Sequence, residues 1–346
     1  MSNEIAILAV LWVGLTLYAL LGGADFGGGV LTALASGPSK EKQREMIAAT
    51  IAPVWEANHV WLIFVITGLF AAFPPAFEAL AVALYVPFSI ALLGIVLRGS
   101  AFAFRAHSEP ESGWRWTWTS VFSVASIITP FVLGAAAGAI ANGDIHIDGP
   151  HITADALRVW LQPLPLLTGF LGLTICAWLA ATYLTVEARA QGARDLEDTF
   201  RRRALIIGVA AGALALAGVL IISSDAPHLW HGMRHRGLPF VLLSVAGGLT
   251  CLAGLQRRRY LIARAGAILA VGAVLAGWGA SQWPYLVVPD LTVRDAAALE
   301  PALRAILVGL IAGGVLLLPS LLVLFRVFKS AKALREPVEE PSEDLA

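Results

Sequence analysis

Two apolar stretches of this sequence contain ionisable side chains that could bind and release protons inside a membrane. Asp25 lies in the stretch GGADFGGG (22–29), and Glu56 and His59 lie in the stretch PVWEANHVW (53–61). An ionisable side chain in the middle of a bilayer costs about 3 kcal/mol or more. Each of these three residues therefore needs a structural or functional reason.

Glu56 and His59 are three residues apart, so a helix would place them on one face. If that helix enters the membrane near Met46, Glu56 lies about 15 Å deep, at a rise of about 1.5 Å per residue. A carboxyl group beside an imidazole can hold or pass a proton, and we favour this function. The alternative is a hydrogen-bonded polar clamp that fixes helix packing.

Three residues near this pair share a second helix face, and we interpret them as supporting polar and packing residues: Trp55, Asn58 and Trp61. The glycines around Asp25 indicate either a close approach of neighbouring helices or a local opening of the helix. The alternative for Asp25 is an acid near a helix end that reaches out to water. We interpret Arg98 and Arg105, near the end of another apolar run, as anchors that reach water in the same way.

The other histidines and all the methionines lie at or beyond the ends of the apolar runs. A haem at His59 with two axial ligands would therefore need one ligand from another chain, although a five-coordinate haem remains an alternative. The segment DAPHLWHGMRH (225–235) spaces its histidines by three and four residues, which permits metal binding on a helix. We expect Pro227 and Gly232 to interrupt a helix there, and we predict no metal and no cofactor in this chain.

The composition is typical of an integral membrane protein. Of the residues, 58% are hydrophobic and 14% are charged, whereas soluble domains have about 25% charged residues. The formal net charge is zero, so no nucleic-acid surface is indicated. Cys176 and Cys251 belong to no CxxC pair, which argues against disulfide and zinc sites.

Nine apolar runs are long enough to cross a bilayer, which predicts an all-α polytopic membrane protein. The expected helices lie near 4–34, 46–73, 77–104, 115–141, 159–188, 203–223, 239–256, 260–281 and 303–328. Residues 1–332 then form one membrane domain, and the acidic tail 333–346 is expected to be disordered.

The positions of lysine and arginine predict the orientation in the membrane. Nineteen of the 24 basic residues fall on the side of the loops that follow the first, third, fifth and seventh helices, together with the C-terminal flank. Basic loops stay in the cytoplasm. The N-terminus is therefore expected outside and the C-terminus in the cytoplasm, which requires an odd number of spans.

The stretch IAPVWEANHVWL (51–62) is similar to the Pro-x-Trp-Asp/Glu-x-Asn-x-Val-Trp motif of subunit II of cytochrome bd-type quinol oxidases. The resemblance continues through LFAAFP (69–74) and covers nearly the whole chain. Further matching positions are residues 22–29, Arg98 to Arg105, Gly134 and Gly138, ATYL (181–184), WPY (283–285) and Pro289. The chain departs from the family at Gly22, where members often have a second Asp, at Glu56, where many have Asp, and at His59, where several have Gln.

The resemblance implies two four-helix bundles plus one peripheral helix in the bacterial inner (plasma) membrane. It implies a partner, subunit I, that carries haems b and d, or b alone, and a complex that oxidises quinol and reduces dioxygen to water. It also allows a bound quinone, contacts with membrane lipids and a small accessory subunit. Within such a complex, Asp25 and Glu56, with His59, would form a proton path from the cytoplasm toward the partner's haem.

Two alternatives belong to other functional classes. Carboxylates in the membrane and glycine-rich helices are also found in proton-coupled secondary transporters. A membrane cytochrome that uses His59 as a haem ligand is the other. A reduced-minus-oxidised spectrum and quinol-driven oxygen uptake of the purified assembly would distinguish these classes from the oxidase.

Overall fold

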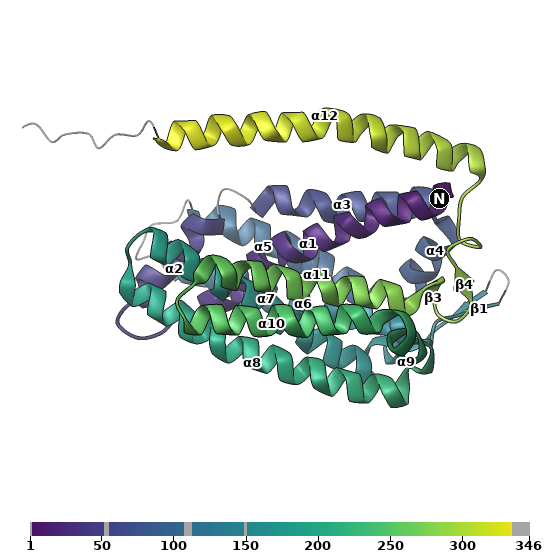
Figure 1. Ribbon diagram of the computed structural model, residues 1–346, viewed down its shortest axis with the longest axis horizontal. Helices are drawn as coiled ribbons and strands as arrows, with labels where there is room; N and C mark the ends of the chain where they lie inside the picture. The colour runs from purple at the N-terminus through teal and green to yellow at the C-terminus, as the bar shows by residue number, and fades with distance from the viewer. Residues whose placement is uncertain (1, 52–54, 107–112, 149–150, 334–346) are drawn as a thin grey trace, which may run out of the picture.

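The computed structural model describes residues 2–51, 55–106, 113–148 and 151–333, most of which are helical (Figure 1). The elements of the first half are α1 (Asn3–Ala33), α2 (Lys40–Ile51), α3 (Trp55–Ala72), α4 (Pro74–Ala83), α5 (Tyr85–Ala106), α6 (Gly113–Asn142), β1 (His146–Asp148), β2 (His151–Thr153) and the 3₁₀ turn η1 (Arg158–Trp160). The elements of the second half are α7 (Pro163–Ala190), α8 (Arg194–Asp225), α9 (Pro227–Gly232), the π-helical turn η2 (Met233–Gly237), α10 (Leu238–Gln256), α11 (Tyr260–Gln282), β3 (Tyr285–Val287), β4 (Leu291–Thr292) and α12 (Glu300–Ala333).

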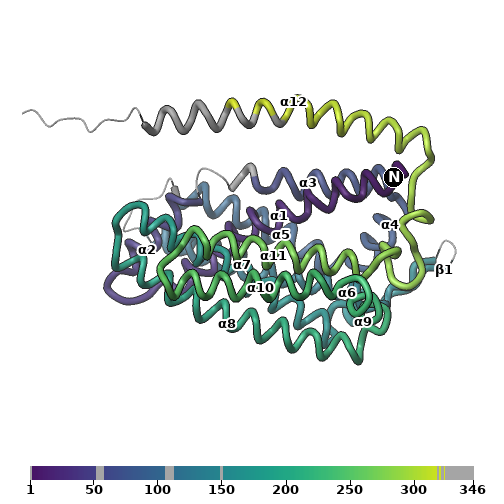
Figure 2. Tube along the Cα trace, viewed as in Figure 1, coloured from purple at the N-terminus to yellow at the C-terminus, as the bar shows by residue number. Residues whose placement is uncertain are grey.

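The long helices run side by side along the molecule, and their connections alternate between its two ends (Figures 1 and 2). By their contacts they form two groups of four, α1, α3, α5 and α6 in one and α7, α8, α10 and α11 in the other, joined where α7 packs on α1 and α6. Helix α12 lies along the outside and contacts α1 and α3. This grouping agrees with the expected pair of four-helix bundles and one peripheral helix.

The surface of the bundle is apolar, as a lipid surround requires. Leu216 and Leu220 on α8 are 68% and 72% exposed, and a water-soluble protein rarely leaves so many large apolar side chains uncovered. Among the described residues, eight helices are long and apolar enough to span a membrane, and α3 with α4 forms a bent pair that raises the count to nine. The predicted all-α polytopic fold is confirmed.

The region predicted as one helix over 46–73 is described in two parts. Helix α2 ends at Ile51 and α3 begins at Trp55. Residues 52–54, which include Pro53, lie outside the described residues. A continuous helix across them therefore stays a prediction, as does the depth of Glu56 counted from Met46.

The next predicted helix, over 77–104, is divided at Leu84, which separates α4 from α5. Helix α4 starts at Pro74 after Phe73 leaves the helical region (φ −136°, ψ 60°), and it is bent by 119° relative to α3. Helix α5 alone then crosses the bundle from Tyr85 to Ala106. The predicted ranges 115–141 and 260–281 lie within α6 and α11. Residues 334–346, which hold almost all of the predicted disordered tail, are outside the described residues.

Candidate functional site

The glycine-rich stretch of α1 brings Asp25 against two neighbouring helices. A Cβ atom at Gly27 would collide with the carbonyl oxygen of Cys176 in α7, and one at Gly29 would collide with the hydroxyl of Ser126 in α6. Only glycine allows backbones to approach this closely. Helix α1 is continuous through the stretch, so the close-approach interpretation of these glycines is supported and local opening of the helix is wrong.

Asp25 forms a buried ion pair with Arg98 of α5. Nη2 of Arg98 lies 2.5 Å from Oδ1 of Asp25, and Nη1 lies 3.0 Å from Oδ2. Nη2 also donates to the backbone carbonyl of Asp25 at 3.1 Å, and Nε donates to Oγ of Ser126 at 3.0 Å. The two charged side chains are only 1% and 2% exposed. This bidentate geometry is the strongest pairing that these two groups make.

The interpretation of Arg98 as an anchor that reaches water is therefore wrong, as is the same alternative for Asp25; the other interpretation of Arg98, as a supporting polar residue like Trp55, Asn58 and Trp61, stays a prediction. The depths of Asp25 and Arg98 explain the pairing. Asp25 and Arg98 each lie eight residues before the last residue of their helix, or about 12 Å from that end. An arginine so far from the helix end cannot reach water easily and needs a counterion inside the bundle.

Two phenylalanine rings surround the guanidinium of Arg98. Its Cζ lies 5.0 Å from the ring centroid of Phe26 and 4.9 Å from that of Phe122, which are distances for cation–π attraction. Sequence reasoning missed both rings and Ser126, because only the fold brings Phe122 and Ser126 of α6 next to Phe26 of α1 and Arg98 of α5.

Helix α3 carries the other candidate residues against α1. Nδ2 of Asn58 donates to the carbonyl of Leu21 at 3.3 Å. The ring of His59 makes edge contacts with Tyr18 and Phe26, with centroids 6.3 and 5.9 Å apart. Phe26 therefore contacts both His59 and Arg98, which places His59 next to the ion pair.

Trp61 packs against the buried cluster of Tyr18, Phe26 and Cys176, so it supports the same contact between α3 and α1. The bond from Asn58 to Leu21 also sets the depth of α3. Leu21 lies twelve residues before the end of α1, which places Asn58 about 18 Å and the backbone of Glu56 about 15 Å from that end. The side chains of Trp55 and Glu56 lie outside the described part of the structure, so their predicted pairing with neighbours stays a prediction.

The helix is interrupted at Pro227, as expected, because α8 ends at Asp225 and α9 starts at Pro227. Gly232 does not interrupt α9, since it has helical backbone angles (φ −60°, ψ −41°). The rings of His231 and His235 stack 4.2 Å apart, and Nδ1 of His235 lies 2.8 Å from the carbonyl of His231. Within the described residues, no three His, Cys, Asp or Glu side chains are grouped as metal ligands.

A second buried carboxylate, Glu197 of α8, was not singled out from the sequence. It is 1% exposed and accepts hydrogen bonds from Tyr260 at 2.5 Å and Arg258 at 3.2 Å. Nη1 of Arg189 lies 3.5 Å away. These bonds join α8 to the end of α7 and to the turn before α11, so Glu197 has a structural role.

Comparison with known proteins identifies the class of membrane protein that has this site. A family model described as cytochrome bd terminal oxidase subunit II matches residues 3–328. The chain belongs to this family. As subunit II it is an integral membrane protein and part of an oxidoreductase complex of the respiratory chain, which it forms with a subunit I. The family membership favours the oxidase over the transporter and the membrane cytochrome.

Individual relatives agree. The cytochrome bd ubiquinol oxidase subunit 2 of Bacillus subtilis is 27% identical over 347 residues, which cover 96% of each chain. A putative cytochrome bd menaquinol oxidase subunit II from the same organism is 21% identical, covering 96% of this chain and 97% of the relative. A chain in the structure of bd oxidase from Geobacillus thermodenitrificans has the same fold, with a TM-score of 0.74, 24% identity and coverage of 95% of this chain and 99% of that one.

Proposed function

We propose that this chain is the haem-free subunit of a quinol oxidase and supplies protons to dioxygen reduction in its partner. Two relatives are named as ubiquinol and menaquinol oxidase subunits, which supports quinol as the electron donor. The haems, b and d or b alone, would lie in subunit I. A bound quinone, lipids and a small accessory subunit would complete the assembly.

The observation that carries the proposal is the buried pair of Asp25 and Arg98 beside His59. Reduction of dioxygen to water consumes protons, and in a membrane they must pass through groups that can hold them. Asp25, Glu56 and His59 follow one another at depths of about 12, 15 and 20 Å from the end of α1. Their order along the bundle suits a path that leads inward from that end.

Arg98 determines what Asp25 can do in this path. Both carboxylate oxygens accept hydrogen bonds from the guanidinium, so a proton added to Asp25 would remove the negative charge on which this pairing depends. Opening the pair inside the bundle is costly, because it leaves a charge without its partner. Glu56 and His59 would therefore carry the proton. Asp25 would contribute to the path through its fixed pair with Arg98, which lies next to His59.

Turnover of the assembled complex tests the proposal. Glu56→Gln should reduce quinol-driven oxygen uptake at unchanged haem content, because an amide cannot carry a proton. Glu56→Asp should retain uptake. Asp195→Asn is the matched control, since Asp195 is an exposed carboxylate at the start of α8, at the same end of the bundle. Unchanged uptake in Glu56→Gln would contradict the proposed path.

We also propose that the N-terminus lies outside and the C-terminus in the cytoplasm. The supporting observation is the distribution of basic residues along the sequence: 19 of the 24 fall on the predicted side of the C-terminal flank, and five fall on the predicted side of the N-terminus, namely Arg158, Arg234, Arg236, Arg294 and Arg304. Both native cysteines are buried, so an engineered cysteine can be labelled selectively. A membrane-impermeant maleimide should label Asp155→Cys but not Asp195→Cys in intact cells, and the reverse result would overturn the orientation.

A further inference from the structure

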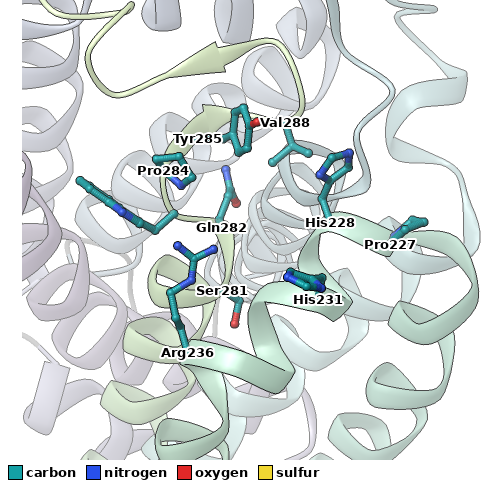
Figure 3. Close-up of a pocket in the computed structure, with 10 residues that line it drawn as sticks. Pro227, His228, His231, Arg236, Ser281, Gln282, Pro284, Tyr285 and Val288 are labelled. Carbon is teal, nitrogen blue, oxygen red and sulfur yellow. The ribbon is translucent and has the colours of Figure 1, made fainter.

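A cavity lies at the end of the bundle where α11 gives way to the β3–β4 hairpin (Figure 3). Its volume is about 270 Å³, which is several times the ~30 Å³ that a water molecule occupies in the liquid. The cavity is lined by Pro227, His228, His231, Arg236, Ser281, Gln282, Trp283, Pro284, Tyr285 and Val288. These residues come from α9, η2, the end of α11 and the segment that follows it.

Close packing fixes the shape of this cavity. A Cβ atom at Gly232 would collide with the carbonyl oxygen of Ser281, and one at Gly237 would collide with the Ser281 hydroxyl. Glycine at these positions thus lets α9 and η2 lie directly on the last turn of α11. Arg236 belongs to the π-helical turn between these two contacts, a kind of turn that is often found at functional sites.

The charge of the lining favours an anion. Arg236 is permanently charged, and no Asp or Glu is among the described residues that line the cavity. Figure 3 shows the guanidinium of Arg236 pointing toward Gln282 and Pro284, with His228 and His231 on the neighbouring side. Arginine binds phosphate by parallel N–H bonds, and the imidazoles add further donors.

A buried acceptor in the cavity restricts the anion further. Gln282 is 8% exposed, and its Nε2 donates to the carbonyl of Leu286 at 3.0 Å. Its Oε1 is buried and has no hydrogen-bond partner among the described residues, a state that costs about 1–3 kcal/mol if nothing donates to it. A ligand that fits the cavity should therefore carry a hydrogen-bond donor close to its negative charge.

The surface next to the cavity is suited to acyl chains. Leu238, Leu242, Val245 and Leu249 are between 49% and 62% exposed, and their spacing of four, three and four residues puts them on one face of α10. This apolar stripe starts directly after η2, two residues beyond Arg236. Trp283, at 37% exposure, and Trp230 lie at the same end, as aromatic side chains do at the membrane–water interface.

We propose that this cavity binds the headgroup of a membrane phospholipid. Arg236 would hold the phosphate, Gln282 would accept a hydrogen bond from a hydroxyl or ammonium group of the headgroup, and the acyl chains would lie along the α10 stripe. Basic pockets between transmembrane helices bind lipid headgroups by the same chemistry. The site is separate from the Asp25–Arg98 pair and does not depend on the proposed proton path.

Native mass spectrometry of the delipidated, assembled complex tests this site with four probes: dioctanoyl phosphatidylglycerol, dioctanoyl phosphatidylcholine, dioctanoylglycerol and inorganic phosphate. Phosphatidylglycerol should bind most tightly, because it has both the phosphate and hydroxyl donors. Phosphatidylcholine lacks a donor, dioctanoylglycerol lacks the phosphate, and inorganic phosphate lacks the acyl chains.

Arg236→Gln should weaken binding of phosphatidylglycerol by about tenfold or more, through the loss of charge-assisted hydrogen bonds. Arg234→Gln is the matched control, because Arg234 stacks over Trp230 with its Cζ 5.7 Å from the ring centroid and does not line the cavity. Both residues are exposed, so both variants should assemble. Equal weakening in the two variants, equal binding of dioctanoylglycerol, or displacement of the lipid by millimolar phosphate would overturn the proposal.

Discussion

Removing Arg98 should strongly destabilise the complex, because it leaves Asp25 charged and buried. The substitution Arg98→Met removes two bonds to the carboxylate, one to the backbone carbonyl of Asp25 and one to Ser126. Breaking a buried pair in this way costs about 3–5 kcal/mol. Since proteins are stable by only about 5–15 kcal/mol in total, the variant should lose about a fifth or more of its stability.

The double variant Asp25→Leu/Arg98→Met separates stability from function. Replacing a buried ion pair by apolar side chains of similar volume is often neutral or stabilising. We therefore expect the double variant to recover most of the stability that Arg98→Met loses. Its quinol-driven oxygen uptake should stay low if the pair takes part in proton transfer.

The assay is size-exclusion chromatography of the heated, detergent-solubilised complex, which gives the midpoint temperature for loss of the intact assembly. The midpoint should fall clearly in each single variant and return to within a few degrees of the parent in the double variant. A parental midpoint in Arg98→Met would refute the argument, because the buried pair would then contribute nothing. A double variant less stable than either single variant would refute it as well.

Three further predictions concern other parts of the fold. Gly27→Ala should destabilise the complex by about 1–3 kcal/mol through overpacking against Cys176. Gly272 has open space around it, so Gly272→Ala should be neutral or stabilising. The midpoints of thermal unfolding of the two variants test this difference. Glu197→Gln should lower the stability of the complex by about 1.5–3 kcal/mol, because it weakens the charged hydrogen bonds of this side chain. Arg258→Ala removes a side chain that is 52% exposed and should lower the stability by less than about 1 kcal/mol. Equal losses of stability in the two variants would contradict the structural role of the buried Glu197. The backbone N–H groups of Arg158 and Leu157 hold the pKa of Asp155 below its ordinary value. The turn after Asp155 should therefore keep this stabilisation above pH ~4 and lose it as the pH falls through the lowered pKa. The loss is measured by hydrogen exchange of these two amides, compared with the same amides in Asp155→Asn.

The sequence allowed a correct prediction of the membrane class and the all-α fold, because long apolar runs are a strong signal. It did not reveal where those runs break. The range 77–104 is divided at Leu84, between α4 and α5, and the sharp bend between α3 and α4 lies just before Pro74. Prolines are tolerated in membrane helices often enough that they do not predict a bend alone.

The candidate site could be predicted only in part. Asp25 and Asn58 were chosen correctly as buried polar residues, because polar groups in apolar runs are conspicuous. The pairing of Asp25 with Arg98 could not be predicted from the sequence directly. The two residues are 73 positions apart, and neither segment indicates which helix packs against it. A signal was nevertheless present. Arg98 lies eight residues inside its helix end, too deep to be explained by a side chain that reaches water.

Proton uptake by the reconstituted complex tests the central claim most directly. The complex is placed in liposomes with a pH-sensitive dye on the side that the C-terminus faces, and a single turnover is started by dioxygen. The parent and Asp195→Asn should take up protons from that side at the same rate, and Glu56→Gln and Asp25→Asn should be slower. Equal uptake rates in all four, at equal haem content, would contradict a proton path through this subunit.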